Sequence, residues 1–151
     1  MRAVIQRVAK ANVVVEGTMV ADIQTEGLLI LLGIGPNDDE KLAQQLAKKI
    51  SAMRIFHDDE GKMNRSVKDI NGEAIVVSQF TLYADCSRGN RPSFTGAALP
   101  EKAAPLVDSF VADLQKYGVP TQTGIFGAEM KVELLNDGPV TIVVEMENPA
   151  V

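Results

Sequence analysis

Two apolar runs constrain the fold of this chain more than any other feature. Leu28–Ile34 is continuous, and Ala74–Val77 begins a second strand that is predicted to extend to Phe80. Runs of this kind, without alternating polar residues, are typical of strands buried on both faces of a sheet. The chain is therefore predicted to bury at least two strands in a substantial core.

A helix is predicted directly after the first of these strands. Pro36 precedes Asn37, which is expected to cap the helix, and Glu40, three residues on, is placed to reach back to the cap. Apolar residues then recur at helical spacing on one face, while lysine and glutamine occupy the other. The apolar positions are Leu42, Leu46, Ile50 and Met53.

A second helix is predicted from about Pro100 or Ala103 to Tyr117, with Gly118 ending it. Its start is not sharply defined because Pro105 lies inside the pattern, and proline is tolerated best in the first turn of a helix. The apolar stripe consists of Ala103, Leu106, Val107, Phe110, Val111 and Leu114.

Further strands are predicted at both ends of the chain, around a motif that reads as a tight turn, Asn136-Asp137-Gly138-Pro139. The order of strands, helix, strand, helix and strands indicates an α+β or mixed α/β fold in a single domain, 1–151, rather than a regular βαβ series. The predicted terminal strands cover residues 2–8, 12–16, 19–24, 129–135 and 140–147.

Composition restricts the possible chemistry. The net charge of −5 and pI of about 4.9 argue against a protein that coats nucleic acid non-specifically, although a local basic patch stays possible. Cys86 and His57 are the only cysteine and histidine, so no Cys/His zinc cluster forms, and His57 has the setting of a capping or surface residue. One cysteine and no signal-peptide pattern predict a cytoplasmic protein.

Polar side chains appear where the second buried strand ends. Ser78, Gln79 and Thr81 follow the apolar run directly, and strand ends are common positions for functional groups. A structural interpretation carries equal weight, because Thr81 suits a strand and Ser78 can bond to the local backbone. Spacing alone leaves both interpretations open.

Several motifs together resemble those of the D-aminoacyl-tRNA deacylases, the D-Tyr-tRNA deacylase family that checks chirality in translation. The resemblance covers nearly the whole chain, and the motifs follow the family's order. They are Met1–Val8, Ser78-Gln79-Phe80-Thr81, Phe126–Met130 and Asn136–Thr141.

This resemblance implies a homodimer with a barrel-like β-sheet flanked by two main helices. It also implies hydrolysis of the ester that joins a D-amino acid to the terminal adenosine of a tRNA, and removal of glycine mischarged on tRNA-Ala. No metal or organic cofactor is implied. The Gly138–Pro139 bond is expected to be cis and to reach the partner's active site, although composition and spacing alone favour a plain trans turn.

The same resemblance assigns roles to individual residues. The catalytic segment is Ser78, Gln79, Phe80 and Thr81, and the Gly138 and Pro139 carbonyls bind the substrate amine and reject L-amino acids. Because Thr81 has no evident base, a positioned water is the expected nucleophile. The supporting residues are Arg7, which holds the Gly-Pro loop, and Phe126 and Met130, which are expected at the pocket for the terminal adenine. Separately from the resemblance, the charges of Arg88, Arg91 and Lys102 make them candidate contacts to tRNA phosphates.

Each of these assignments has an alternative. Arg7 is also compatible with a surface ion pair, Phe126 with a core position, and the other basic residues with solvated surface charge. For the whole protein, the competing classes are a non-enzymatic RNA- or protein-binding module and a hydrolase of another small ester or N-acyl substrate.

Overall fold

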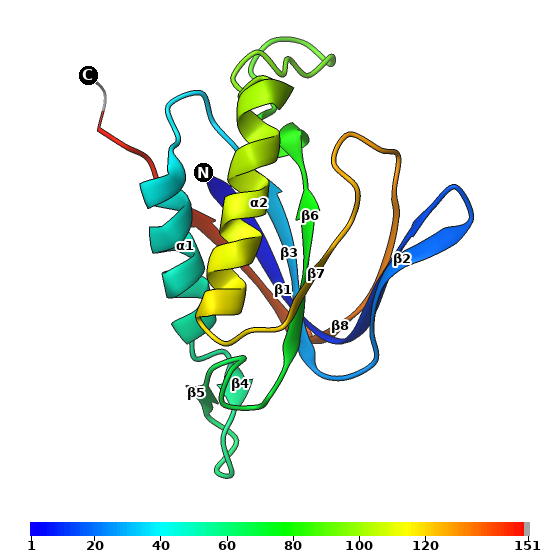
Figure 1. The fold of residues 1–151 in the computed structure, drawn as a ribbon, viewed down its shortest axis with the longest axis vertical. Helices are drawn as coiled ribbons and strands as arrows, with labels where there is room; N and C mark the ends of the chain where they lie inside the picture. The colour runs from blue at the N-terminus through cyan, green and yellow to red at the C-terminus, as the bar shows by residue number, and fades with distance from the viewer. Residues whose placement is uncertain (150–151) are drawn as a thin grey trace.

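The computed structural model describes residues 1–149. A curled six-stranded sheet has the strand order β2-β1-β3-β6-β7, and β8 pairs with the free side of β1 (Figure 1). A separate two-stranded ribbon, β4–β5, follows the first helix. The strands are β1 (Arg2–Val15), β2 (Thr18–Ile23), β3 (Gly27–Gly33), β4 (Phe56–His57), β5 (Met63–Arg65), β6 (Glu73–Ser78), β7 (Thr121–Thr123) and β8 (Lys131–Glu145).

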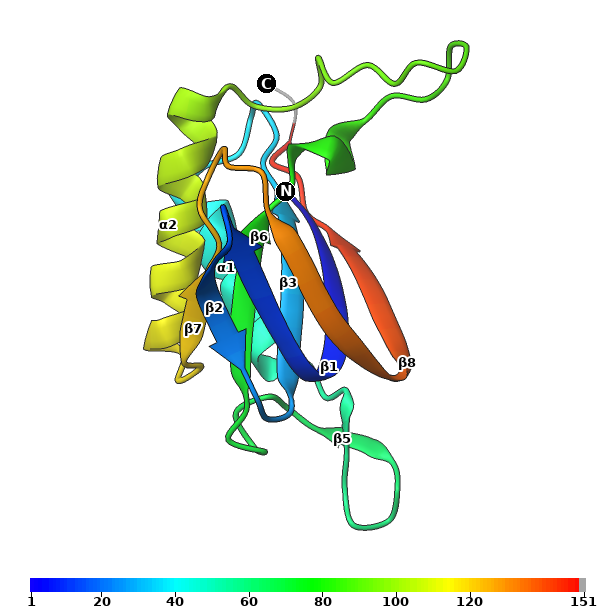
Figure 2. The same cartoon turned by 90° about the vertical axis from the view of Figure 1, so that its right-hand side faces the viewer.

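Both helices cover the same face of the sheet (Figure 2). They are α1 (Glu40–Ala52) and α2 (Pro100–Lys116), and their buried stripes pack on β3 and β6. On the other face the sheet curls until β2 contacts β6 and β7, which encloses a second, smaller core. The predicted α+β class and the barrel-like sheet flanked by two helices are therefore confirmed. β3 and β6, the two predicted buried strands, run parallel at the centre.

The terminal strands differ from the prediction. The strands predicted at 2–8 and 12–16 belong to one continuous strand, β1, which ends at Val15. Residues 131–145 form one continuous strand, β8, which pairs with β1 on both sides of a bulge. The predicted tight turn at Asn136–Pro139 is therefore wrong. The ladder pairs Gln6 with Thr141 and Val8 with Asn136, so residues 137–140 bulge out of β8 opposite Arg7 alone.

This bulge explains why a proline is tolerated within β8. Proline has no N–H to donate to a ladder and is confined to edges and bulges of sheets. Pro139 lies in the part of β8 that has left the register with β1, so no ladder hydrogen bond is lost there. The ladder resumes at Thr141.

The helix ends also need one correction. Asp39, and not Asn37, caps α1, because the Asp39 carboxylate accepts a hydrogen bond from the Leu42 amide at 2.9 Å. That amide holds the pKa of Asp39 below its usual value. The second helix begins at Pro100, the earlier of the two predicted starts, and accommodates Pro105 within it. His57 is exposed in β4, beyond the end of α1, and does not cap the helix.

No helix within residues 1–149 is long and apolar enough to cross a membrane.

Candidate active site

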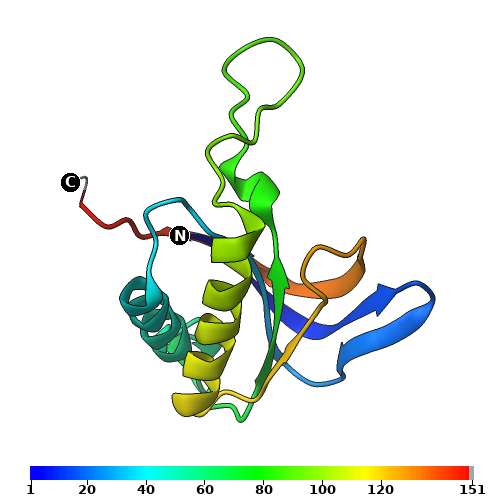
Figure 3. The same cartoon turned by 45° about the horizontal axis from the view of Figure 1, so that its top comes forward.

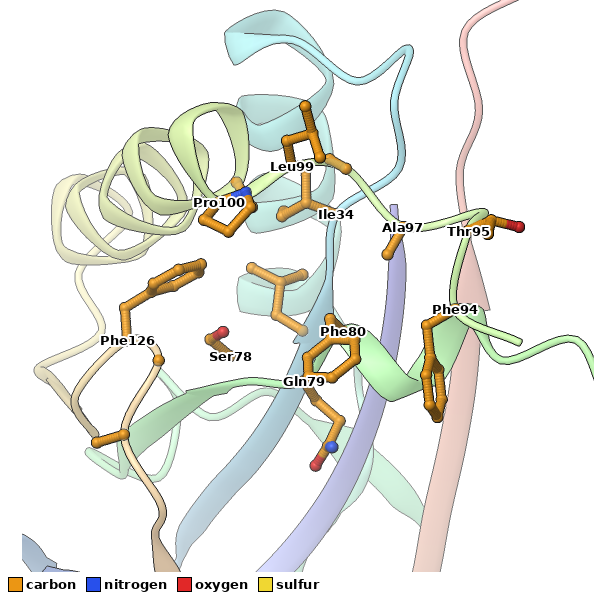
Figure 4. Close-up of a pocket in the computed structure, with 15 residues that line it drawn as sticks. Ile34, Ser78, Gln79, Phe80, Phe94, Thr95, Ala97, Leu99, Pro100 and Phe126 are labelled. Carbon is orange, nitrogen blue, oxygen red and sulfur yellow. The ribbon is translucent and has the colours of Figure 1, made fainter. Parts of the chain in front are cut away.

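A cavity of about 510 Å³ opens at the carboxyl ends of the parallel strands β3 and β6. This is the edge of a sheet at which ligands commonly bind. The cavity lies between the N-terminus of α2, the loop after β7 and a short 3₁₀ turn, η1 (Phe80–Tyr83) (Figure 4). Its lining is mainly apolar, from Leu32, Ile34, Phe80, Phe94, Leu99, Pro100, Phe126 and several alanines.

Ser78 and Gln79 connect the central sheet to this cavity. Ser78 ends β6, and the Gln79 amide donates to the Leu32 carbonyl at 2.8 Å, so the chain leaves the sheet at a fixed point. In Figure 4 Ser78 lies on the cavity floor, whereas the Gln79 side chain points away from the centre. The Gln79 Nε2 group donates a hydrogen bond to the Thr81 hydroxyl.

Thr81 belongs to η1 and is exposed. The alternative in which Thr81 serves as a strand residue is therefore wrong, since β6 ends at Ser78. Its hydroxyl oxygen accepts from Gln79, which leaves the hydroxyl proton free to be donated elsewhere. Thr81 does not line the cavity, and it is the residue that follows Phe80 in the η1 turn.

Aromatic rings form two sides of the cavity. Phe80 and Phe94 meet edge to face with ring centroids 5.2 Å apart, and Phe126 stands on the opposite side (Figure 4). Phe80 is 57% exposed and Phe126 39% exposed, so neither residue belongs to the core of the single chain. Sequence reasoning missed Phe94, because a lone phenylalanine in a polar loop carries no periodic signal before the loop is folded against η1.

Met130 does not line this cavity. Its sulfur lies so close to Gly124 that a Cβ at that glycine would approach it to 2.4 Å, and the side chain packs on the second core, inside the curled sheet. Within one chain, Met130 therefore supports the β7–β8 loop that carries Phe126.

No acid or base is available inside the cavity. Among residues 1–149, every side chain that lines it is non-ionisable, and no group of three or more histidine, cysteine, aspartate or glutamate residues is arranged to hold a metal ion. The polar groups that the described lining offers are hydroxyls, a side-chain amide and backbone groups, from residues such as Ser78, Gln79 and Thr95.

The β8 bulge is a second, rigidly held feature. The Gly138–Pro139 bond is cis, as the resemblance implies, and both residues are exposed. Arg7 is only 4% exposed and donates through Nε to the Asp137 carbonyl at 2.9 Å and through Nη1 to the Ile55 carbonyl at 2.7 Å. The surface ion-pair alternative for Arg7 is therefore wrong.

The Asn136 side chain forms hydrogen bonds across the base of the bulge. Its side-chain amide donates to the carbonyl of Arg7 on β1 and to the carbonyl of Val140, the last residue of the bulge, each at 2.9 Å. The Gly138 and Pro139 carbonyls are thus carried on a loop whose base is fixed on both sides.

The bulge and the cavity lie at opposite ends of the sheet. Arg7 pairs with Leu28 at the start of β3, whereas Ser78 pairs with Leu32 near its end. Four residues of strand correspond to about 13 Å, and β1 and β3 also separate β8 from β6. Gly138 and Pro139 therefore do not reach the cavity of their own chain.

Three basic residues lie on the segment between η1 and the first turn of α2. Arg88 and Arg91 are exposed on a loop that projects from the fold and is closed at its base by backbone hydrogen bonds between Asp85 and Ser93 (Figure 3). Lys102, in the first turn of α2, donates to the Pro36 carbonyl.

Comparison with known proteins gives consistent matches. A family model described as D-Tyr-tRNA(Tyr) deacylase matches residues 4–145. Proteins named D-aminoacyl-tRNA deacylase are 59% identical in Roseiflexus castenholzii, over 96% of this chain and 92% of the relative, and 52% identical in Deinococcus radiodurans, over 97% and 100%.

Solved structures show the same fold. A structure described as c-Myc DNA Unwinding Element Binding Protein is 40% identical with a TM-score of 0.91, covering 98% of this chain and 100% of the other. A structure described as a probable eukaryotic D-amino acid tRNA deacylase is 14% identical with a TM-score of 0.82, covering 96% and 98%.

Proposed function

Because the chain belongs to the D-Tyr-tRNA(Tyr) deacylase family, we propose that it hydrolyses the ester bond between a D-amino acid and the terminal adenosine of a tRNA. The observation that carries this proposal is the aromatic-walled cavity lined by Ser78, Gln79 and Phe80, with Thr81 directly after them in the chain. A purine base is a flat apolar ligand that stacks on aromatic rings. Adenine would occupy the space between Phe126 and the Phe80–Phe94 pair, with the ester beside the η1 turn.

The hydrolysis uses a water molecule rather than a protein nucleophile. Thr81 has no base within the cavity, but its free hydroxyl proton is suited to orienting a water or the ester carbonyl. The Phe80 and Thr81 amides begin η1, where a helix leaves its first N–H groups without intrahelical acceptors. Such amides stabilise a developing oxyanion by about 3 kcal/mol. The 2′-hydroxyl of the terminal ribose assists the attack.

Chirality is read by the bulge of a second copy of the chain. Gly138 and Pro139 are exposed, lie on a loop whose base Arg7 and Asn136 hold, and are too far from the cavity of their own chain to act there. A symmetric homodimer brings each bulge to the partner's cavity, where the carbonyls bind the α-amino group. An L-side chain would then collide with the bulge, and each 1.4 kcal/mol of collision energy is about tenfold in discrimination.

The same steric argument applies to a glycyl ester. Because it has no side chain to collide with the bulge, glycyl-tRNA, including glycine mischarged on tRNA-Ala, is also a substrate. Arg88, Arg91 and Lys102 contact phosphates of the tRNA end in this proposal, which their charge and exposure support. The enzyme works in the cytoplasm on charged tRNA.

The function is tested by incubating the protein with D-Tyr-tRNA, L-Tyr-tRNA and Gly-tRNA and following release of the amino acid. We expect rapid loss of the D-ester, slower loss of the glycyl ester, and no acceleration with the L-ester. Equal rates for the D- and L-esters would indicate a general ester hydrolase. Binding of tRNA without hydrolysis of any ester would indicate a non-enzymatic RNA-binding module.

Replacing Thr81 with alanine is expected to slow hydrolysis of D-Tyr-tRNA only modestly, by about tenfold, because one orienting hydrogen bond is lost while the backbone donors stay. Single-turnover measurements of the Thr81→Ala and Thr81→Ser variants test this, since serine retains the hydroxyl. A trapped acyl group on Thr81, or a Thr81→Ala rate equal to that of the uncatalysed reaction, would show that Thr81 is the nucleophile.

A further inference from the structure

Arg2 contacts the back of the η1 turn. Its Nη1 group donates to the Leu82 carbonyl at 2.9 Å, and its guanidinium carbon lies 4.4 Å from the centroid of the Tyr83 ring. A guanidinium over an aromatic face is held there by the ring's quadrupole. Arg2, the first residue of β1, thus contacts Leu82 and Tyr83, the last two residues of η1. The first two residues of the same turn are Phe80 and Thr81.

Tyr83 is suited to this contact because it remains a neutral phenol. Burial, with a further contribution from the Asp38 carboxylate, raises the pKa of Tyr83 to about 12. The ring is wedged against the end of β3, where a Cβ on Gly35 would lie 2.8 Å from the Tyr83 hydroxyl oxygen. The Gly35 amide in turn donates to Asp38 at 2.6 Å, which fixes the strand end beneath the ring.

The turn rests directly on backbone. A Cβ on Gly33 would lie 3.1 Å from both the Gln79 carbonyl oxygen and the Leu82 Cβ. Because β3 packs against one side of η1 and Arg2 binds Leu82 and Tyr83 on the other, η1 has little freedom to rotate.

The position of Arg2 is itself fixed. Arg2 pairs with Glu145 in the β1–β8 ladder, and the Glu145 carboxylate lies 3.4 Å from Nε. The Nε atom is buried and makes no hydrogen bond with the described residues. The attraction to the Glu145 carboxylate therefore offsets part of the cost of burying this polar group. Arg2 thereby couples the end of β8 to the catalytic turn.

From this arrangement we propose that Arg2 is a positioning residue for the deacylation reaction, because it holds η1 so that the Gln79–Thr81 pair and the first amides of the turn face the ester. The proposal rests on the proposed function of the cavity. Arg2 does not line the cavity, so it acts on the rate of the chemical step and not on substrate binding.

The test compares Arg2→Met, which keeps an apolar stem, with Arg2→Lys, which keeps a cation and a donor. We expect Arg2→Met to lower the single-turnover rate on D-Tyr-tRNA by between about tenfold and a hundredfold, the effect of a small misplacement of reacting groups. KM should stay within about twofold, and Arg2→Lys should recover most of the rate. Arg65→Ala, which breaks an exposed ion pair with Asp59, is the matched control.

Hydrogen exchange supplies a readout that is independent of catalysis. The Leu82 and Ala84 amides donate to the Gln79 and Thr81 carbonyls within the turn. Arg2→Met should accelerate exchange of these two amides by about tenfold or more, while the α1 amides stay protected. An unchanged single-turnover rate, equal losses in Arg2→Met and Arg2→Lys, or unchanged exchange in η1 would overturn the proposal.

Failure of the proposed function gives a different result. In that case the unaltered protein itself leaves D-Tyr-tRNA intact, and the positioning role fails with it. An active unaltered protein with a fully active Arg2→Met variant overturns the role of Arg2 alone.

Discussion

Replacing Gly138 with alanine should lower the rate of D-Tyr-tRNA hydrolysis by about a hundredfold, because the bulge cannot keep its shape with a side chain at this position. A Cβ on Gly138 would lie 2.7 Å from the Val140 Cγ2, 2.9 Å from the Val140 amide nitrogen and 3.1 Å from the Arg7 Nη2. The Gly138 φ of +140° is also unfavourable for alanine. The backbone must therefore shift, and the two carbonyls shift with it.

The matched control is Gly61→Ala in the β4–β5 ribbon. Gly61 also has a positive φ, +77°, but a Cβ there has nothing within 4 Å. This variant carries a similar conformational strain without a collision near the site, and it should keep wild-type activity. Equal activities of the Gly138→Ala and Gly61→Ala variants, both folded by circular dichroism, would contradict a role for the bulge.

Mixing two inactive variants tests whether the bulge acts on the partner subunit. Gly138→Ala has an intact cavity and a damaged bulge, whereas Ala128→Arg has a blocked cavity and an intact bulge. After the subunits exchange at random, half of the dimers are mixed, and each has one complete site. Activity should return to about a quarter of the wild-type value. If both features must lie in one chain, the mixture stays inactive.

The elements that the sequence predicted correctly are those with a strong local signal. Leu28–Ile34 and the Ala74 run became the two central strands because continuous apolar residues are stable only where both faces of a strand are covered. The two helices followed from apolar spacing alone. Ser78 and Gln79 lie at the cavity because polar residues that end a buried strand emerge at the edge of the sheet.

The β8 bulge could not be predicted in the same way. Asn-Asp-Gly favours a tight turn wherever two apolar segments flank it, and the local signal is identical for a hairpin and for a bulge. The difference lies in β1, which is long enough to pair with both halves of β8 and so keeps them in one line. Arg2 and Phe94 were missed for a related reason, since their roles depend on contacts with η1. Arg2 is distant from η1 in sequence, and Phe94 meets Phe80 only once the intervening loop has folded back.

Replacing Arg7 with alanine should reduce the free energy of unfolding by about 3 kcal/mol, since one buried and one partly buried carbonyl group lose a charged donor. Arg7 Nε and Nη1 join the Asp137 carbonyl in the bulge to the Ile55 carbonyl before β4. The alanine variant leaves both carbonyls without this partner and opens a cavity beside β1. Urea denaturation at fixed protein concentration measures the change, because the stability of the proposed dimer would depend on protein concentration.

Arg7→Lys separates charge from geometry. A lysine retains the cation but has a single head group, so it cannot donate from two separate nitrogens to carbonyls in two different segments. We expect it to lose about half as much stability as the alanine variant and still to lose activity, since the bulge is then held only by Asn136. Arg65→Ala should change stability by less than about 0.5 kcal/mol, as an exposed pair does. An Arg7→Ala variant within that same margin would mean that Asn136 alone maintains the bulge.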